Sequence, residues 1–354
     1  MKKTSKIMSL VLAGAMVLSM TACAGNTAET TSAAAKSQET AADTASKAEE
    51  TTGAEASESE TAAKAEGTTY KIGVLQLVQH TALDAANDGF IAALDDAGIA
   101  YEVDQQNASG DQSACQTVAS KFANEKKDLI LAIATPAAQA MVGAVEDTPV
   151  LITAVTDPAE SGLVDTNEKP GANVTGTSDL TPVKEQIDLL KQLVPEAKTV
   201  GVLYCSAESN SKIQADMAKE AIAAAGMESK EYTVSSSNEI QTVVQSMVGA
   251  VDAVYAPTDN VIAAGMATVG MVAGDNNLPV ICGEAGMVQN GGLATYGIDY
   301  YQLGYMTGQQ AVKILTEGAS PADMPIEYLP AEKCELTGNE ETAQTLGIDV
   351  SGLK

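Results

Sequence analysis

Residues 128–139 read Asp-Leu-Ile-Leu-Ala-Ile-Ala-Thr-Pro-Ala-Ala-Gln, an apolar run that is followed at once by the start of a helix. The uninterrupted apolar segment Leu129–Ile133 suits a strand of a parallel sheet that is covered on both faces. Thr135 before Pro136 is typical of the first turn of a helix. The stretch therefore predicts one strand–helix unit of an α/β protein.

The same unit recurs along the chain from residue 70 onwards. Strands are expected at 71–78, 99–105, 128–134, 149–155, 199–205, 230–234, 251–256, 279–282, 293–298 and 326–329, and helices at 83–97, 112–125, 136–145, 183–193, 210–225, 239–248, 261–274 and 301–316. Repeated β-α-β units with short gaps predict doubly wound parallel sheets. About ten strands are more than one such sheet usually holds. Because the series restarts after the Gly/Asn/Thr stretch 171–179, we expect two Rossmann-like lobes of similar size.

The composition argues against several function classes. The chain of 354 residues has 20 basic and 47 acidic side chains, a net charge of -27, no Arg and one His. No Lys/Arg stripe can form, which argues against a nucleic-acid partner. A single His excludes His-pair metal sites, and a Ser-His-Asp triad would have to use His80. Without a P-loop, C-x-x-C or G-x-G-x-x-G motif, we expect no metal ion, no cofactor and no enzyme activity.

Residues 1–22 have the three parts of a secretory signal peptide: a start with three Lys, an apolar run over 7–20, and a small-residue end. The apolar run is about 14 residues, shorter than the ~20 that a spanning helix needs. Small residues directly before Cys23 resemble a lipobox, which would make Cys23 the acylated N-terminus of a lipoprotein. The alternative is an ordinary signal-peptidase site with an incidental Cys. We expect a lipid-anchored protein on the extracytoplasmic side of the cell membrane.

Residues 23–68 are rich in Ala, Thr, Ser and Glu, with no aromatic side chain. Such a segment cannot bury enough apolar surface to offset its ordering entropy, so it predicts a disordered acidic linker. The four cysteines beyond it are widely spaced, which does not predict a disulfide framework. We expect free, buried thiols at Cys115, Cys205, Cys282 and Cys334.

Polar side chains follow most of the expected strands. In open α/β sheets, ligands bind beyond the carboxyl ends of the strands, so these residues predict a ligand cleft between the lobes. Helix capping is the alternative for Thr135, Ser209 and Asp259, because such residues also cap helices. The candidate ligand-binding residues are His80, Thr135, Thr156, Asp157, Ser209, Asn210, Ser211, Asp259 and Glu284.

Seven short segments occur in an order that points to a family. They are His80–Asp84 with Asp88–Phe90, Thr135–Gln139, Thr156–Pro158, Asn173–Gly176, Glu208–Ser211, Pro257–Asn260 and Asp299–Gly304. Together they resemble the ABC substrate-binding lipoproteins of the tryptophan/tyrosine uptake type. The resemblance runs from about Tyr70 to Leu329, nearly the whole region that is expected to fold.

The resemblance implies a type I periplasmic-binding fold, in which two lobes are joined by a hinge and the chain crosses between them three times. The first lobe would take residues 69–176 and 295–320, and the second 177–294 and 321–354. It also implies an amino acid, expected to be aromatic, as the small-molecule ligand, with an ABC permease and its ATPase as partners. The alternative is a sensory module that delivers an amino acid or another small polar solute to a receptor.

A buried amino acid must have both of its charges compensated. Because the chain has no Arg, the ligand carboxylate must meet hydroxyls, helix N-termini or Lys. Thr135 and Thr156 stand at strand-to-helix or strand-to-loop junctions, where free N–H groups converge. We expect these two residues to hold the carboxylate, with Ser209 and Ser211 as weaker candidates.

The ligand ammonium needs an acidic partner. Asp259 and Glu284 are the preferred candidates, because contacts from both lobes to one ligand would make closure depend on the ligand. Asp157 is a third candidate, for which turn chemistry of the Asp-Pro pair is the alternative.

His80 is expected to stack on the ligand or to hydrogen-bond to it, with a structural histidine as the alternative. An aromatic ligand also needs apolar or aromatic walls. Tyr204, Tyr255 and Tyr296 are the nearest tyrosines by position, and all three could equally belong to the core.

Overall fold

The structure is a computed structural model that describes residues 68–353. The predicted signal peptide, Cys23 and the predicted linker up to Gly67 lie outside the described residues. Among the helices of the described part, none is long and apolar enough to cross a bilayer.

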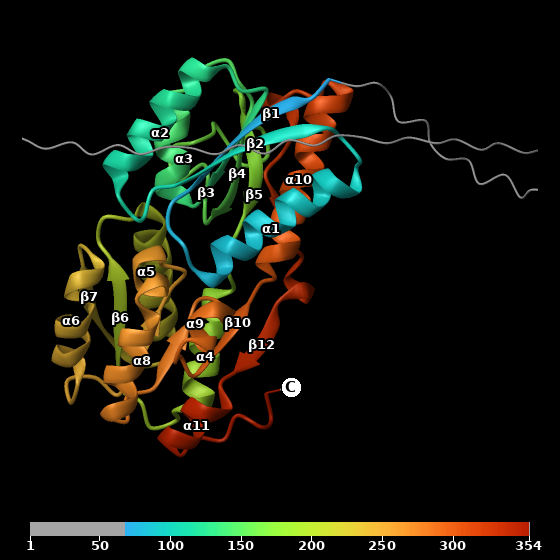
Figure 1. Cartoon of the computed structure of the whole chain (residues 1–354). Helices are drawn as coiled ribbons and strands as arrows, with labels where there is room; N and C mark the ends of the chain where they lie inside the picture. The colour runs from blue at the N-terminus through green and yellow to red at the C-terminus, as the bar shows by residue number, and fades with distance from the viewer. Residues whose placement is uncertain (1–67, 354) are drawn as a thin grey trace, which may run out of the picture. The chain divides into compact units, whose positions relative to one another are not determined.

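The first sheet has six strands in the order β11-β5-β4-β3-β1-β2, and every neighbouring pair in it is parallel (Figure 1). Its strands are β1 (Tyr70–Gln76), β2 (Tyr101–Asn107), β3 (Leu129–Ile133), β4 (Val150–Val155), β5 (Val174–Ser178) and β11 (Glu327–Tyr328). The apolar run Leu129–Ile133 forms β3, and all five of its residues are buried. The core of this lobe lies on both faces of the sheet, as the apolar runs predicted.

The second sheet also has six strands, in the order β12-β10-β9-β8-β6-β7. Only the pair β10–β12 is antiparallel in this sheet. Its strands are β6 (Thr199–Cys205), β7 (Glu228–Val234), β8 (Ala253–Ala256), β9 (Val280–Cys282), β10 (Ala294–Gly297) and β12 (Glu335–Gly338). Two sheets, each with its own helices, confirm the predicted doubly wound α/β architecture.

Helices cover both sheets. Those packed on the first sheet are α1 (Thr81–Asp96), α2 (Gln112–Glu125), α3 (Thr135–Val142) and α10 (Tyr300–Glu317). Those of the second lobe are α4 (Val183–Leu193), α5 (Ser209–Ala224), α6 (Ile240–Met247), α7 (Asn260–Ala264), α8 (Met266–Asp275), α9 (Ala285–Gln289) and α11 (Glu340–Leu346). Short 3₁₀ turns lie at Ser237–Glu239, Pro321–Asp323 and Ala331–Lys333.

Amphipathic spacing and caps explain why these segments are helical. In α4, Val183, Ile187 and Leu190 recur at helical spacing and are all buried. In α2, the carboxylate of Asp111 accepts hydrogen bonds from the backbone N–H groups of Ser113 and Ala114. The predicted helix 261–274 is instead two helices, α7 and α8, which meet at Gly265.

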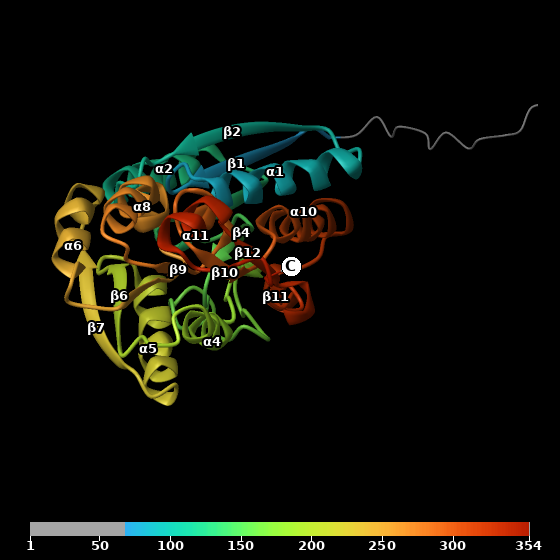
Figure 2. The same ribbon diagram turned by 90° about the horizontal axis from the view of Figure 1, so that it is seen from below.

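Helices α1 and α10 lie side by side although they are more than 200 residues apart in the sequence, as Figures 1 and 2 both show. Two glycines of the quoted motifs permit this approach. A Cβ on Gly89 would clash with the carbonyl oxygen of Tyr301, and one on Gly304 would clash with the carbonyl oxygen of Ala86. The motifs Asp88–Phe90 and Asp299–Gly304 therefore describe one close helix contact.

The stretch 171–179, predicted to be only a break between lobes, contains β5. Its sequence Val-Thr-Gly-Thr-Ser has no apolar run, yet all five residues are buried. The hydroxyl of Thr177 lies 3.0 Å from that of Thr153 and 2.8 Å from that of Thr307, so the threonines satisfy one another inside the lobe. Hydrophobic periodicity has no signal for such a strand.

Two strands were assigned to the wrong lobe, and the predicted boundary between 176 and 177 also falls inside β5, which runs to Ser178 in the first sheet. Strand β10, which we assigned to the first lobe with 295–320, pairs in the second sheet. Strand β11, which we assigned to the second lobe with 321–354, pairs with β5 in the first sheet. Both errors arise because pairing partners, not strand propensity, decide where a strand near a crossing belongs. Within the described residues, the chain passes between the sheets at 179–182, 298–299 and 329–334.

The four cysteines of the described part are free. Cys115, Cys205 and Cys282 are buried, as expected, whereas Cys334 is partly exposed. Strand β12 and helices α9 and α11 were not predicted from the sequence, and all three are short elements.

Candidate functional site

A small enclosed cavity lies between the two lobes, beyond the carboxyl ends of both sheets. The space inside it that is open to water-sized molecules is about 10 Å³, which is about the room for a single water molecule. Its walls are His80, Leu83, Ala154, Asp179, Asn210, Thr258, Asp259, Asn260, Ala263, Glu284 and Tyr300. This is the location that open α/β sheets favour for a ligand.

Strand ends and helix starts position the polar walls. His80 and Asp179 follow the ends of β1 and β5, while Asp259 and Glu284 follow β8 and β9. In the second lobe the two acids are N-caps. Asp259 accepts from the N–H of Ile262 at 2.8 Å, and Glu284 accepts from the N–H groups of Gly286 and Met287 at 2.5 and 2.8 Å.

Three buried acceptor atoms of this cavity have no hydrogen-bond partner in the described residues: Asp179 Oδ1, Asn210 Oδ1 and His80 Nδ1. The orientation of Asn210 follows from its Nδ2, which donates to Glu208 Oε2 and to the carbonyl oxygen of Thr258. The other oxygen of Asp179, Oδ2, accepts from the hydroxyl of Tyr300 at 2.7 Å, and the hydroxyl of Thr156 also acts on this carboxylate. Native proteins rarely leave such atoms unpaired.

The tautomer of His80 follows from its neighbour. Asn260 Nδ2 donates to Glu208 Oε2 at 2.6 Å, so Asn260 Oδ1 faces His80 Nε2, 3.2 Å away. Nε2 therefore carries the proton, and Nδ1 is an acceptor as long as the ring is neutral. Burial lowers the pKa of His80 below its usual range, which keeps the ring neutral at pH 7.

Four carboxyl groups in or beside the cavity are buried, and none of them has an ion-pair partner within residues 68–353. Burial raises the pKa of Asp179 to about 6, against the opposing effect of the hydroxyls of Tyr300 and Thr156. Burial also raises the pKa of Glu284 to about 7. The pKa of Asp259 rises for the same reason. Burial and the charge of Asp259 raise the pKa of Glu208 to about 8.

The two lobes are joined across the cleft by side-chain hydrogen bonds. Beside the His80–Asn260 contact, Gln214 Nε2 donates to the hydroxyl of Thr156 at 2.9 Å, and Gln139 Nε2 donates to that of Ser209 at 3.3 Å. Each contact pairs one residue of the first lobe with one of the second. The lobes are therefore closed on each other in this structure.

Of the nine predicted ligand-binding residues, the structure places four on the cavity wall: His80, Asn210, Asp259 and Glu284. The other five, Thr135, Thr156, Asp157, Ser209 and Ser211, do not line it. Thr156 and Ser209 bind the opposite lobe instead. The hydroxyl of Ser211 hydrogen-bonds to Asp259 and does not line the cavity. That of Thr135 is buried without a partner.

Asp157 serves its own loop. Its Oδ1 accepts from the backbone N–H groups of Ala159 and Glu160, both at 3.1 Å, and from Asn167 Nδ2 at 3.0 Å. This is the turn chemistry that the Asp-Pro pair offered as the alternative.

Sequence reasoning missed several cavity residues. Asp179 was missed because it follows β5, the strand without an apolar run. Asn260 and Tyr300 stand inside or beside quoted motifs, and only the tertiary structure shows that they face the cavity.

The aromatic wall of the cavity is Tyr300, and none of the three tyrosines suggested by position lines it. Tyr255 is fully buried and donates to Gln186 Oε1 at 2.7 Å, while Tyr204 donates to Glu231 at 3.0 Å.

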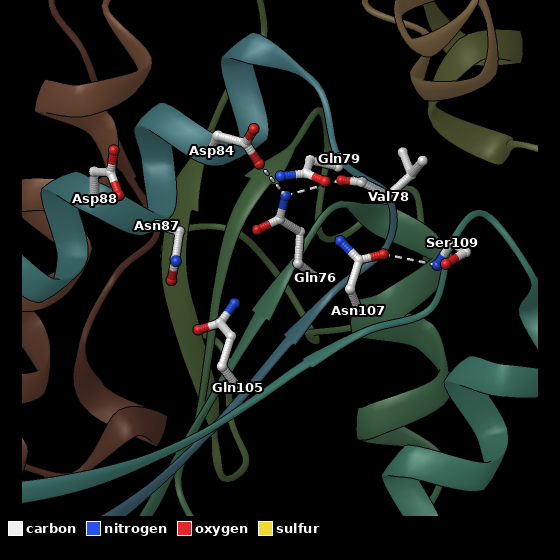
Figure 3. A pocket seen from close by; sticks show the side chains of 9 residues that line it. All are labelled: Gln76, Val78, Gln79, Asp84, Asn87, Asp88, Gln105, Asn107 and Ser109. Atoms are coloured by element: carbon white, nitrogen blue, oxygen red, sulfur yellow. Dashed lines mark hydrogen bonds between the residues drawn. The ribbon is translucent and has the colours of Figure 1, made fainter.

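A second, open groove lies within the first lobe (Figure 3). It holds about 800 Å³ and is lined by Gln76, Val78, Gln79, Asp84, Asn87, Asp88, Gln105, Asn107 and Ser109. Gln76 Nε2 is held by Asp84 Oδ1 at 2.7 Å, as Figure 3 shows. No predicted ligand-binding residue lines this groove, and it contains no residue of the second lobe. Within residues 68–353, no group of three or more His, Cys, Asp or Glu could hold a metal ion.

Comparisons with known proteins place the chain in a family. Residues 71–352 match the family model described as ABC transporter substrate binding protein. The chain is 41% identical over 353 residues to a "Tyrosine-binding protein" of Clostridioides difficile (strain R20291), which covers 98% of this chain and 94% of the relative. Solved sugar-transporter structures at 12–15% identity, with TM-scores of 0.54 to 0.56, share only the fold.

Two solved structures differ instructively in their similarity to this one. A domain from Streptococcus pneumonia in complex with L-Trp is 40% identical, with a TM-score of 0.77 over 80% of this chain and 96% of its own. A ligand-free, open substrate binding protein from Clostridium difficile is 46% identical, yet its TM-score is 0.61 over 79% and 96%. Over a similar share of the chain, the structure described here is therefore more similar to the complex with L-Trp than to the open structure. The sequence match over nearly the whole folded region and the two-lobed fold lead to one conclusion: the chain belongs to the ABC transporter substrate binding protein family.

Proposed function

We propose that this protein captures an aromatic amino acid between its lobes and delivers it to an ABC permease for import. One observation carries the proposal: three unpaired acceptors belong to residues that line one enclosed cavity, and none of the described residues that line it is a lysine. A primary ammonium has three N–H donors and no acceptor, so it complements this set. Relatives named for tyrosine binding and solved with L-Trp support an aromatic amino acid as its carrier.

The ammonium would lie against Asp179 Oδ1, Asn210 Oδ1 and His80 Nδ1. Asp179 supplies the compensating negative charge, and Glu284 supplies a second one nearby. This assignment moves the main ammonium partner from Asp259 and Glu284, the two residues preferred from sequence, to Asp179. The oxygens of Asp259 already accept from the N–H groups of Cys205 and Ile262.

The ligand carboxylate would be held by free backbone N–H groups rather than by the hydroxyls that the sequence suggested. Helices α1 and α5 begin at the cavity, and their N-caps, His80 and Glu208, make no side-chain cap hydrogen bond. Their first-turn N–H groups therefore remain available to an anion. By contrast, the starts of α7 and α9 are occupied by Asp259 and Glu284.

The aromatic ring would pack on Tyr300 and on the apolar walls Leu83, Ala154 and Ala263. With room for only one water in the closed state, the site must admit its ligand from an open cleft, and the walls must move apart to hold a ring. Binding is thus expected to require hinge motion.

Localisation follows the N-terminal motif. We propose a signal peptide over 1–22 and an acyl anchor on Cys23, so that the folded region is tethered on the extracytoplasmic side beside the permease. Cys23→Ala should release the protein from the membrane fraction while its melting temperature stays unchanged, as measured by fractionation and thermal unfolding. Full retention of the variant in the membrane fraction would rule out the anchor.

The ligand assignment is tested by calorimetry with L-tryptophan, L-tyrosine, their deamino analogues and their amides, with L-leucine as the non-aromatic control. Loss of the ammonium leaves a buried acid unpaired, which costs about 3–5 kcal/mol, or roughly 150- to 5,000-fold in affinity. Amidation of the carboxylate leaves neutral donors partly satisfied, so the loss should be ~1–3 kcal/mol. An amide that binds more weakly than the deamino analogue would show that a charged group, and not neutral N–H donors of this cavity, holds the carboxylate, and the site proposed here would be wrong.

A further inference from the structure

Asp179 lines the cavity and also lies where the chain crosses from the first lobe to the second. It is the first residue after β5 and begins the first crossing segment, 179–182. Its Oδ2 accepts from the hydroxyl of Tyr300, which begins α10 directly after the second crossing segment, 298–299. One carboxylate therefore ties together two of the three segments about which the lobes must move.

Among the described residues, the groups that share the cavity with Asp179 are acidic or neutral. The titratable side chains that share its cavity are His80 at the start of α1, Asp259 at the start of α7, Glu284 at the start of α9, and Tyr300 on α10. Burial keeps His80 neutral. Asp259 and Glu284 have backbone N–H partners, but Asp179 has none for Oδ1, although the residue is only 4% exposed.

We propose that Asp179 couples hinge closure to charge: the lobes close over the cavity only when a cation or a proton neutralises this carboxylate. In the open state water solvates the anion, and closure removes that water. The ammonium of the ligand compensates the charge, so the loaded protein closes. Without a ligand, closure at neutral pH would bury an unpaired anion, so the empty protein stays open. The permease therefore does not meet a closed protein that carries no ligand.

The direction of the pH dependence follows from linkage. Closure raises the pKa of Asp179 to about 6 and that of Glu284 to about 7, above the values of hydrated carboxyl groups. Protonation of these two carboxyl groups therefore favours the closed empty state, whereas protonation of His80, whose pKa burial lowers, opposes it. Because two carboxyl groups act against one imidazole, we expect the closed population to grow as the pH falls through these values. One coupled proton changes the open–closed ratio up to about tenfold per pH unit. The coupling between the charge of Asp179 and lobe closure depends on the proposed function in one respect only, namely that the neutralising cation is the ammonium of an amino acid.

The test follows the distance between the lobes in the full-length protein without ligand. Fluorophores on non-canonical residues at Gln116 of α2 and Gln245 of α6, both exposed, report closure by energy transfer. We expect low transfer at pH 8 and high transfer at pH 5.5. Asp179→Asn, which mimics the protonated carboxyl, should give high transfer at both pH values. Asp188→Asn, a charge change on the surface of α4, should follow the wild type.

A second variant tests the same coupling through one hydrogen bond to Asp179, with no change of charge. Tyr300→Phe removes a donor that favours the ionised carboxylate, so the closure midpoint should move to higher pH. Equal transfer at pH 8 and pH 5.5 in the empty wild type would overturn the proposal, as would an Asp179→Asn profile that matches the wild type. If the empty protein responds as expected but no aromatic amino acid raises transfer at pH 8, the proposed ligand is wrong and the coupling stands.

Discussion

Asp104 and Asp179 are carboxylates in the same lobe with opposite environments. Asp104, on β2, accepts from Lys121 at 2.7 Å and from Lys127 at 2.9 Å. Although partial burial opposes it, these hydrogen bonds hold the pKa of Asp104 well below its usual range. Asp179 has no cationic partner in the described residues, and burial raises its pKa to about 6.

The difference shows where the chain pairs its acids with its own lysines and where it leaves acids for a cationic ligand. Lysines meet acids on the helices and strands of the surface, as at Asp104 and at Asp216, which contacts both Lys212 and Lys219. The cavity between the lobes contains no lysine although its acids are far more buried. An uncompensated buried anion costs free energy, so this arrangement favours a cationic ligand.

The largest expected effect is on ligand affinity at the uncompensated site. Asp179→Asn should weaken the best aromatic amino acid by about 3 kcal/mol, or roughly 150-fold, because its ammonium loses its closest counter-charge. Asp104→Asn is the matched control and should leave the dissociation constant unchanged in calorimetry. Equal losses in the two variants would show that the overall charge, not the cavity, sets affinity.

The next effect concerns the pH dependence of stability in the empty protein. Because burial raises the pKa of Glu284 to about 7, its folded pKa lies above its unfolded value. The folded state therefore loses stability as the pH rises from 5 through 7, by up to about 1–3 kcal/mol for this group. Glu284→Gln should flatten that decline in urea-unfolding series. A decline as steep as in the wild type would assign the pH dependence to other groups.

A substitution at Asp259 distinguishes a helix-capping role from a ligand-binding role. Asp259→Asn removes the charge while it keeps an N-cap acceptor, so we expect a loss of about 1 kcal/mol in unfolding free energy. Its affinity for the ligand should fall less than that of Asp179→Asn, since both oxygens of Asp259 are already engaged. A larger affinity loss at Asp259 would restore it as the main ammonium partner.

The smallest effect is expected at the ion-paired surface. Asp104→Asn should lower the unfolding free energy by no more than ~1 kcal/mol at pH 7, since partly exposed ion pairs contribute little. The folded pKa of Asp104 is depressed, so this contribution is present above its unfolded pKa of about 3.9. The gap between wild type and variant should therefore close as the pH falls from 5 to 2, in thermal unfolding at each pH.

Four predicted site residues reached the cavity because strand ends carry ligand sites in this fold class. His80, Asn210, Asp259 and Glu284 each stand after an apolar run that was visible in the sequence. Thr135, Thr156 and Ser209 stand at similar positions, yet one is buried away from the cavity and two bind the opposite lobe. Strand position alone does not tell a residue that faces the ligand from one that closes the cleft.

The sequence by itself determined the α/β architecture, most of its strands and helices and the family, because apolar runs, helical spacing and short motifs are local. Only the tertiary structure decided three features: the buried polar strand β5, the sheet to which β10 and β11 belong, and the position of Asp179 at the hinge. Each depends on partners far away in the chain. The hydroxyl of Thr177 pairs with that of Thr307, and Oδ2 of Asp179 accepts from Tyr300, across 130 and 121 residues. Hydrogen bonds and burial at such separations exist only once the chain has folded, so no local pattern encodes them.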